Sequence, residues 1–305
     1  MAYGSPESVA DLPGYLADIR GNRPTTGAVL EEISGNYAAI GGRSPLAEQT
    51  RRQAEAVGSV LDEDGKGLFR IYVGMRHWSP WIEETVGKML DDGVTRAISM
   101  VLAPHYSRMS VGQYQRKIAD GLEMYRGCID FAHVDSYHDA PGLICALAKR
   151  VRDGVSRWPE EARDPVHVIF SAHSLPARIL GEDDPYDSQV RQTASLVAAR
   201  AGIPRDRWSW SYQSAGRSDE PWLGPALPDH LAELAERGVR DVVSVPVGFV
   251  CDHVEVLYDI DVAARRVAAE LDMRLERPPA LNDDPVFIRQ LADVIRSRAA
   301  ERKWV

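Results

Sequence analysis

Short apolar runs rich in β-branched residues alternate with longer segments of helical periodicity along most of this chain. The runs that predict strands are 68–73, 97–102, 129–134, 166–170 and 242–247. The segments that predict helices are 81–90, 143–151, 189–201 and 253–271. Such alternation is typical of parallel sheets covered by helices on both faces. We therefore predict an α/β protein with two doubly wound halves.

The length of 305 residues predicts about two domains. We place the first half at 1–135 and the second at 136–284, and expect a final helix within 285–305 to pack back on the first half. The opening segment 1–6 reads as the end of a strand, although a central strand needs about five or six residues. We expect either a natural start upstream of Met1 or a shortened first strand.

One strand-like run, 166–170, ends where small polar residues begin. It leads through Ser171, where we expect the strand to stop, into a turn that contains His173 and Pro176. Ligands of open parallel sheets bind beyond the carboxyl ends of the strands. A lone histidine here is also typical of an ordinary turn or cap. Because a neutral imidazole can accept a proton or bind a metal, His173 is the first candidate for a site.

A second run, 242–247, ends in a similar way and leads through Gly248 to Glu255 and Asp259. Glu255 is expected in the first turn of a helix, with Asp259 on the same face because it follows four residues later. Acidic residues in a first turn also interact favourably with the helix dipole, which is a purely structural reading. A carboxylate opposite an imidazole can receive a divalent cation or relay protons. We therefore assign Glu255 and His173 to one site.

Charge and composition exclude several classes of protein. The chain has 45 acidic and 36 basic residues, a net charge of -9 and no long basic run, which argues against a nucleic-acid partner. No apolar run reaches the roughly 18 to 20 residues that span a bilayer, and the amino terminus lacks a signal-peptide pattern. The three cysteines are too widely spaced for a disulfide framework or a C-x-x-C metal site. We expect a cytoplasmic protein without integral membrane association.

Several strings of residues together resemble the ferrochelatase family. They are MAYGSPESV, AAIGGRSPL, VLAPHYS, FSAHSLP, YQSAGR followed by PWLGP, and PVGFVCDHVEVLYDID. They cover essentially the whole chain in family order, and they are most similar to the Gram-positive enzymes that act on coproporphyrin III. The resemblance implies a chelatase fold, with two Rossmann-like halves and a porphyrin cleft between them. It also implies insertion of Fe2+ into coproporphyrin III, by porphyrin distortion and pyrrole deprotonation, in haem b biosynthesis.

The resemblance implies roles for individual residues. His173 matches the histidine that accepts a pyrrole proton and lies at the iron site, and Glu255 matches the glutamate across the cleft. Tyr3 matches a tyrosine on the other porphyrin face that can ligate the product iron, and Asp259 is implied as an outer relay. The positions implied to contact the porphyrin are Tyr3, Arg20, Asn36, Tyr37, Ser44 and Tyr114.

The chain departs from the family pattern at a few positions. Asn36 stands where close relatives have an arginine, so we expect one weaker propionate contact. Ala263 stands where some relatives have a glutamate, so we expect no second metal site beside Asp259. The final residues ERKWV contain no cysteine, so no iron–sulfur cluster is expected.

The resemblance implies a reaction that needs no organic cofactor. It also implies that Fe2+ is a substrate and not a resident cofactor. It implies a monomer that makes transient contact with a downstream enzyme of the haem pathway. One alternative is insertion of iron into protoporphyrin IX. A second is a chelatase for another ring and metal, and the more remote third is a non-catalytic tetrapyrrole-binding protein.

Overall fold

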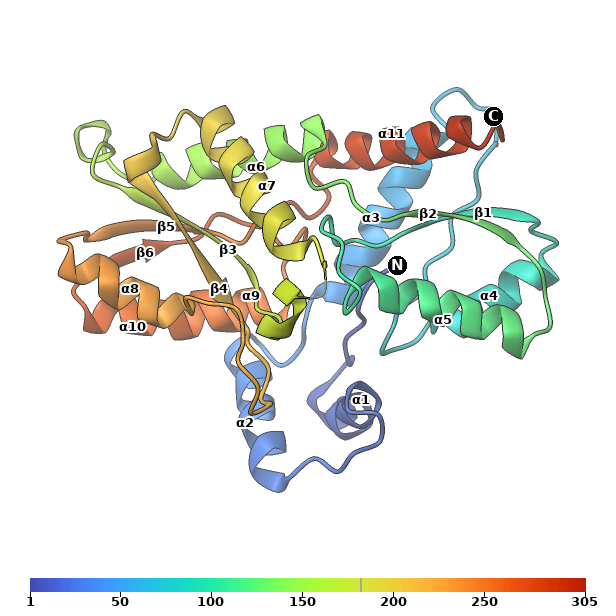
Figure 1. The fold of residues 1–305 in the computed structure, drawn as a ribbon, viewed down its shortest axis with the longest axis horizontal. Helices are drawn as coiled ribbons and strands as arrows, with labels where there is room; N and C mark the ends of the chain where they lie inside the picture. Colours follow the sequence, from blue (N-terminus) through green and yellow to red (C-terminus); the bar gives the residue numbers. More distant parts are fainter. Residues whose placement is uncertain (182) are drawn as a thin grey trace. The chain divides into compact units, whose positions relative to one another are not determined.

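The computed structural model describes residues 1–181 and 183–305 of the chain. These residues form two compact units. The first unit comprises Met1–Tyr137 and Asp283–Val305, and the second comprises His138–Asn282. Each unit is an α/β unit with its own parallel sheet (Figure 1).

The second unit contains a four-stranded parallel sheet in the order β4, β3, β5, β6. The strands are β3 (His167–His173), β4 (Trp208–Gln213), β5 (Asp241–Val245) and β6 (Arg274–Glu276). The chain adds β4 on one side of β3 and then crosses to add β5 on the other side. Open α/β sheets bind ligands at such a reversal of strand order, outside the carboxyl ends of the strands. The carboxyl ends of β3 and β5 therefore mark the expected place of a site.

Helices cover both faces of this sheet, as the alternating pattern predicts. They are α6 (Pro141–Val155), α7 (Tyr186–Ala201), α8 (Leu227–Glu236), α9 (Val254–Tyr258) and α10 (Arg265–Glu270). Figure 1 shows α6 and α7 on one face and α8 and α10 on the other. Both faces of β3 are buried, as for the neighbouring residues Ile169 and Phe170, and its centre is accordingly apolar.

The predicted uninterrupted helix over 253–271 is wrong in its middle. A π-helix, Asp259–Ala264, separates α9 from α10. In a π-helix the backbone bonds run from i to i+5, and such turns occur frequently at functional sites. Asp259 was expected on the same helix face as Glu255, four residues earlier, because a regular α-helix was assumed. The π-helix begins at Asp259 itself, so the regular α-helical spacing ends there.

The first unit contains a two-stranded parallel sheet of β1 (Arg96–Met100) and β2 (Asp130–Val134). Its helices are α1 (Leu12–Ile19), α2 (Gly27–Ala39), α3 (Leu46–Leu61), α4 (Ile82–Asp91), α5 (Val111–Met124) and α11 (Pro285–Glu301). Helix α11 packs against α3, where the Arg296 guanidinium donates to the Val60 carbonyl at 2.6 Å. Short 3-10 helices lie at Val9–Asp11, Glu160–Ala162, Ala177–Gly181 and Arg205–Arg207.

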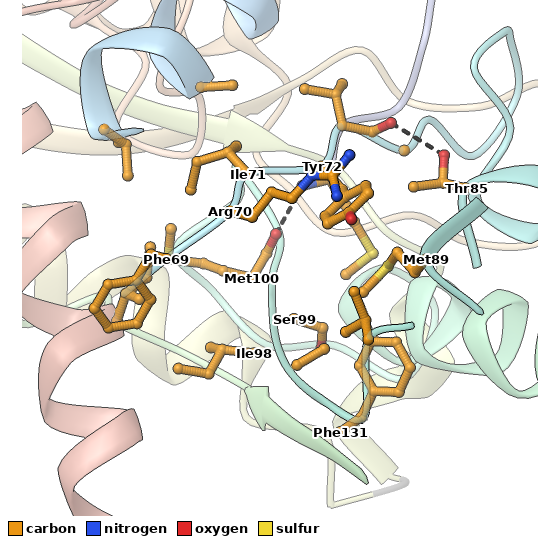
Figure 2. Close-up of a pocket in the computed structure, with 18 of the residues that line it drawn as sticks. Phe69, Arg70, Ile71, Tyr72, Thr85, Met89, Ile98, Ser99, Met100 and Phe131 are labelled. Carbon is orange, nitrogen blue, oxygen red and sulfur yellow. Dashed lines mark hydrogen bonds between the residues drawn. The ribbon is translucent and has the colours of Figure 1, made fainter. Parts of the chain in front are cut away.

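The predicted strand over 68–73 is not a strand in the structure. The segment carries the apolar pattern of a strand, but within the described residues no neighbouring strand pairs with it. It borders a cavity of about 390 Å³ that residues of β1 also line (Figure 2). The apolar pattern therefore marks a segment whose composition suits a strand. The segment is not a strand because no neighbouring strand of the described residues pairs with it.

Candidate active site at the ends of β3 and β5

His173 is the last residue of β3 and not part of the turn that follows. The strand was expected to stop at Ser171, but its pairing with β4 continues until His173 lies opposite Gln213. The Ser171 hydroxyl donates to the Gln213 side-chain oxygen at 2.7 Å, which ties the two strand ends together. The imidazole therefore projects from the carboxyl end of β3, whose backbone is held by strand pairing.

Two hydrogen bonds hold His173 in place. The Tyr186 hydroxyl, at the start of α7, donates to the His173 carbonyl at 2.8 Å. Burial raises the pKa of Tyr186 far above its ordinary value, so its phenol stays neutral and remains a donor. The imidazole Nδ1 contacts the Ser174 carbonyl. A carbonyl can only accept, so Nδ1 carries the hydrogen and Nε2 of the neutral ring carries the lone pair.

A close backbone approach brings the segment after β5 beside His173. A Cβ at Gly248 would lie 2.6 Å from the Cβ of Ala172, so only glycine fits without a shift. The Gly248 amide donates to the Ser171 carbonyl at 3.3 Å. Phe249 then packs edge-on against the His173 ring, with ring centroids 6.4 Å apart.

The Glu255 carboxylate lies between two imidazoles. Its Oε1 is 3.7 Å from Nε2 of His173, and its Oε2 is 3.6 Å from Nε2 of His253. The His253 Nδ1 donates to the Cys251 carbonyl at 3.1 Å, which leaves its Nε2 as the acceptor in the neutral ring. His253 lies two residues before Glu255 in the sequence but was not among the predicted site residues.

The side chains of His173, His253 and Glu255 direct hydrogen-bond acceptors toward one another when both imidazoles are neutral. With both rings neutral, two lone pairs face a carboxylate, an arrangement that a proton or a cation between them stabilises. Burial raises the pKa of Glu255, but protonation of the neighbouring rings, which gives His173 a charge and lets His253 donate a hydrogen bond, outweighs burial and holds this pKa below its ordinary value. Glu255 therefore stays ionised, and the cluster attracts protons and cations.

Asp259 lies at the start of the π-helix and contacts the hydroxyl of Ser214. The pKa of Asp259 is raised to about 6, mainly by burial and also by the charge of Glu255, although the Ser214 hydrogen bond lowers it. Two carboxyl groups near one another thus differ in protonation, since Glu255 holds its charge while Asp259 exchanges its proton near neutral pH. This difference suits a proton relay.

The raised pKa of Asp259 predicts a pH dependence of stability. The carboxyl contributes its full stability below its unfolded pKa of about 3.9, and this contribution is lost as the pH rises through about 6. We therefore expect the free energy of unfolding of the wild type, relative to Asp259→Asn, to fall as pH rises from about 4 to 6. Urea unfolding of both proteins across that range measures the difference. A constant or rising difference would contradict the raised pKa.

Arg277 connects the two segments that flank the cluster. Its guanidinium donates to Asp252 at 2.7 Å and to both carboxylate oxygens of Asp261 at 2.9 and 2.6 Å. Asp252 immediately precedes His253, and Asp261 belongs to the π-helix. The Arg277 side chain is only 6% exposed, whereas the two carboxylates are half-buried.

Removal of this guanidinium should destabilise the second unit strongly. Arg277→Ala removes a buried guanidinium from the half-buried carboxylates of Asp252 and Asp261, and breaking a buried ion pair typically costs about 3 to 5 kcal/mol of unfolding free energy. Arg277→Lys retains the charge but not the paired contacts, so we expect an intermediate loss. Urea unfolding near neutral pH measures both variants. A loss below about 1 kcal/mol for the alanine variant would show that the network contributes little.

In the first unit, two predicted residues gather around one arginine. The Arg76 guanidinium lies 5.9 Å from the Tyr3 ring centroid and 5.7 Å from that of Tyr114. The His77 ring packs on Tyr3 with centroids 4.5 Å apart, and its Nδ1 lies 2.6 Å from a carboxylate oxygen of Asp18. Arg76 and His77 were not among the predicted site residues.

The remaining predicted porphyrin contacts occupy different places in the first unit. Tyr37 and Ser44 are buried, with exposed fractions of 2% and 7%. Asn36 is half-buried on α2, and Arg20 follows the end of α1. The Arg20 Nε atom is buried without a hydrogen-bond partner among the described residues. The contact of these four residues with a porphyrin stays a prediction.

The described residues contain neither a metal-binding cluster nor a membrane-spanning helix. Between residues 1–181 and 183–305, no group of three or more histidine, cysteine, aspartate or glutamate side chains is arranged to hold a metal ion. Nor does that part of the chain contain a helix of the length and apolar character needed to cross a membrane.

Comparison with known proteins places both units in one family. The Ferrochelatase family pattern matches residues 1–299. The ferrochelatase of Deinococcus radiodurans is 60% identical over 301 residues, which cover 99% of this chain and 95% of that protein. The coproporphyrin III ferrochelatase of Geobacillus kaustophilus is 40% identical over 303 residues, with 99% and 95% covered.

A solved structure shares the fold. SirB from Bacillus subtilis with Fe3+ has a TM-score of 0.53 and 13% identity, and the match covers 82% of this chain and 91% of that one. This likeness supports the predicted chelatase fold. Because the family pattern and the relatives extend over almost the whole chain, the protein belongs to the ferrochelatase family.

Proposed function

We propose that this ferrochelatase inserts Fe2+ into coproporphyrin III. The observation that carries the proposal is the set of acceptors formed by His173, His253 and Glu255 at the ends of β3 and β5. Metal insertion must remove both pyrrole N–H protons while a divalent cation enters. A base with an available lone pair beside an ionised carboxylate serves both requirements.

In the proposed reaction, Nε2 of His173 accepts a proton from a pyrrole nitrogen. Glu255, 3.7 Å away, stabilises the imidazolium that forms. The proton then passes to solvent, with Asp259 as the outer relay, and the ring can accept the second pyrrole proton. Each freed nitrogen lone pair binds Fe2+. A bent porphyrin directs these lone pairs toward the ion, so preferential binding of the bent ring lowers the barrier.

Fe2+ is a substrate in this scheme, and the proposal includes neither an organic cofactor nor an iron–sulfur cluster. The imidazole nitrogen of His173 and the carboxylate of Glu255 are suitable donors for the incoming ion. We assign Tyr3 of the first unit to the other porphyrin face, as an axial ligand of the product iron. Arg76, beside the Tyr3 ring, adds a positive charge near that tyrosine.

Coproporphyrin III is the proposed porphyrin because it carries a propionate on every pyrrole ring, whereas protoporphyrin IX carries propionates on only two. Arg20, Asn36, Tyr37, Ser44 and Tyr114 are the proposed propionate partners. The buried Arg20 Nε, which lacks a partner in the described residues, supports a role as a donor to a carboxylate. The name of the Geobacillus kaustophilus relative points to the same porphyrin.

A comparison of the two porphyrins tests this choice. We expect kcat/KM for iron insertion to be at least about tenfold higher with coproporphyrin III, because one additional charged hydrogen bond contributes about 1.5 to 3 kcal/mol. Arg20→Gln should lower kcat/KM for coproporphyrin III more than for protoporphyrin IX. The exposed Arg23→Gln serves as the control. Faster turnover of protoporphyrin IX by the wild type would overturn the assignment of the substrate.

A further inference from the structure

A hydrogen-bonded cluster of four side chains lies in the second unit, at the amino ends of β3 and β4. His167 is the first residue of β3, Ser209 is the second residue of β4, and His230 and Glu233 belong to α8. His173 ends the same β3 strand, about 20 Å from its start at the usual rise per residue. The reaction proposed above uses none of these four side chains.

The Ser209 hydroxyl lies between two imidazoles. Its Oγ is 2.7 Å from Nε2 of His230 and 2.8 Å from Nε2 of His167. On the far side of the His230 ring, Nδ1 lies 3.2 Å from Oε2 of Glu233, which follows three residues later and so shares a face of α8. A hydroxyl, a base and a carboxylate that orients the base have these separations in enzymes with an activated nucleophile.

The single hydroxyl hydrogen of Ser209 sets the direction of these bonds. A carboxylate can only accept, so Nδ1 of His230 carries a hydrogen and Nε2 of the neutral ring carries the lone pair. The Ser209 hydroxyl therefore donates to His230. Because this hydroxyl has no second hydrogen, Nε2 of His167 is the donor in the other contact. His230 is thus positioned as the base for Ser209.

His167 stays neutral and presents an N–H to the same oxygen. Burial lowers the pKa of His167 to about 4, and the charges of Arg237 and Arg207 lower it further. Near neutral pH the ring therefore cannot take the hydrogen of Ser209. Its N–H remains beside Oγ when this oxygen attacks a carbonyl group, and there it can donate to the developing oxyanion.

Ser209 is half-buried on an edge strand. Among the named strands, β4 pairs only with β3, and Ser209 lies opposite Ile169. His167 and His230 are buried, with exposed fractions of 4% and 6%, whereas Ser209 keeps part of its surface open to solvent. The hydroxyl therefore has a backbone held by strand pairing, a base shielded from water and access for a small reagent.

Hydrogen bonds in a buried polar cluster can also serve only to satisfy its polar atoms. The direction of the bonds favours a reactive serine, because the hydroxyl donates to a base whose other nitrogen meets a carboxylate. The His167 N–H lies at the same oxygen, where negative charge develops during attack. One such donor suits acyl transfer, whereas a phosphoryl group presents three charged oxygens.

We propose that Ser209, His230 and Glu233 form a second reactive site, at which the Ser209 hydroxyl attacks small carboxylic esters. Oγ bonds to the carbonyl carbon while its proton passes to Nε2 of His230. The bond from this carbon to the alcohol oxygen then breaks, and the alcohol takes the proton from the imidazolium. Water attacks the acyl group next, and His230 transfers its proton to Oγ, which releases the acid and restores Ser209.

Covalent labelling of the full chain with a fluorophosphonate tests the nucleophile. Attack of Oγ on phosphorus expels fluoride and leaves an adduct. We expect mass spectrometry of tryptic peptides to find the adduct on Ser209 and not on Ser188, an exposed serine of α7 that contacts no imidazole among the described residues. His230→Gln should slow labelling at least about tenfold through loss of the base. Labelling of Ser209 no faster than that of Ser188 would overturn the proposal.

Glu233→Gln tests the carboxylate in a variant that should fold normally, because the Glu233 side chain is 62% exposed. We expect it to slow labelling of Ser209 about two- to fivefold, a modest loss because water screens an exposed carboxylate. Glu236→Gln is the matched control on α8, since Glu236 is exposed and contacts no imidazole within the described chain, and should label at the wild-type rate. Equal rates in wild type and Glu233→Gln would remove Glu233 from the site.

The ester p-nitrophenyl acetate tests the substrate class. We expect acetylation of Ser209 and release of more than one p-nitrophenolate per chain, and Ser209→Ala should lose both. Acetylation of Ser209 no faster than that of the exposed Ser188 would overturn the assignment to esters, even if the fluorophosphonate labels Ser209.

Discussion

Replacing His173 with alanine is expected to lower kcat for iron insertion by about 10²- to 10⁴-fold at saturating Fe2+. The expectation follows from the geometry at the end of β3, where the Ser174 carbonyl fixes Nδ1 as the donor and leaves Nε2 as the free base. Anaerobic loss of the free-base porphyrin spectrum measures the rate. The side chain is 30% exposed, so the variant should fold with near-normal stability.

Two controls make the His173→Ala result specific. His138→Ala removes another imidazole of the second unit, whose Nε2 lies 3.0 Å from the Gln192 side chain, and should leave the rate unchanged. Porphyrin binding by His173→Ala, measured by fluorescence, should remain within a few-fold of the wild type. Wild-type rates for His173→Ala at saturating metal would show that another group accepts the pyrrole protons.

Glu255→Gln is expected to lower kcat by about 10²- to 10³-fold at a small cost in stability, because the lowered pKa of Glu255 means that the folded state favours its charged form. The substitution removes the charge that stabilises a His173 imidazolium, 3.7 Å from Oε1. Its amide can donate a hydrogen bond to the Nε2 lone pair of one neighbouring ring, so the folded state loses no partner. Steady-state kinetics and urea unfolding of the same preparations separate the two effects.

Glu233→Gln is the matched control for Glu255→Gln. Glu233 also pairs with an imidazole, that of His230 at 3.2 Å, but it lies on α8, away from the ends of β3 and β5. Its variant should retain wild-type kcat. Unchanged kcat for Glu255→Gln would remove the carboxylate from the proposed mechanism, and equal losses in both variants would indicate a general effect on the second unit.

The pairing of His173 with Glu255 could be predicted from the sequence because it depends on topology. Both residues follow apolar runs, and the carboxyl ends of neighbouring parallel strands meet at one edge of the sheet. The participation of His253 could not be predicted in this way. Its role depends on the Cys251 carbonyl, which fixes its tautomer, and on Gly248, whose contact with Ala172 brings this segment to β3.

Local conformation was less predictable than topology. The periodicity over 253–271 correctly indicates helix, but apolar spacing does not distinguish an α turn from the π turn at Asp259–Ala264. The raised pKa of Asp259 results from burial in the folded chain, which no local pattern reveals. The apolar run 68–73 has the composition of a strand, yet pairing requires a neighbour on its edge, and that neighbour depends on distant parts of the chain.

The most direct test of the proposed function is anaerobic titration of purified wild-type protein with coproporphyrin III and Fe2+. We predict that the free-base spectrum disappears over many turnovers per protein molecule, with release of the iron complex, and that the rate collapses in His173→Ala. Tight binding of coproporphyrin III without Fe2+-dependent loss of its free-base spectrum would contradict the account, and would indicate a tetrapyrrole-binding protein that does not insert metal.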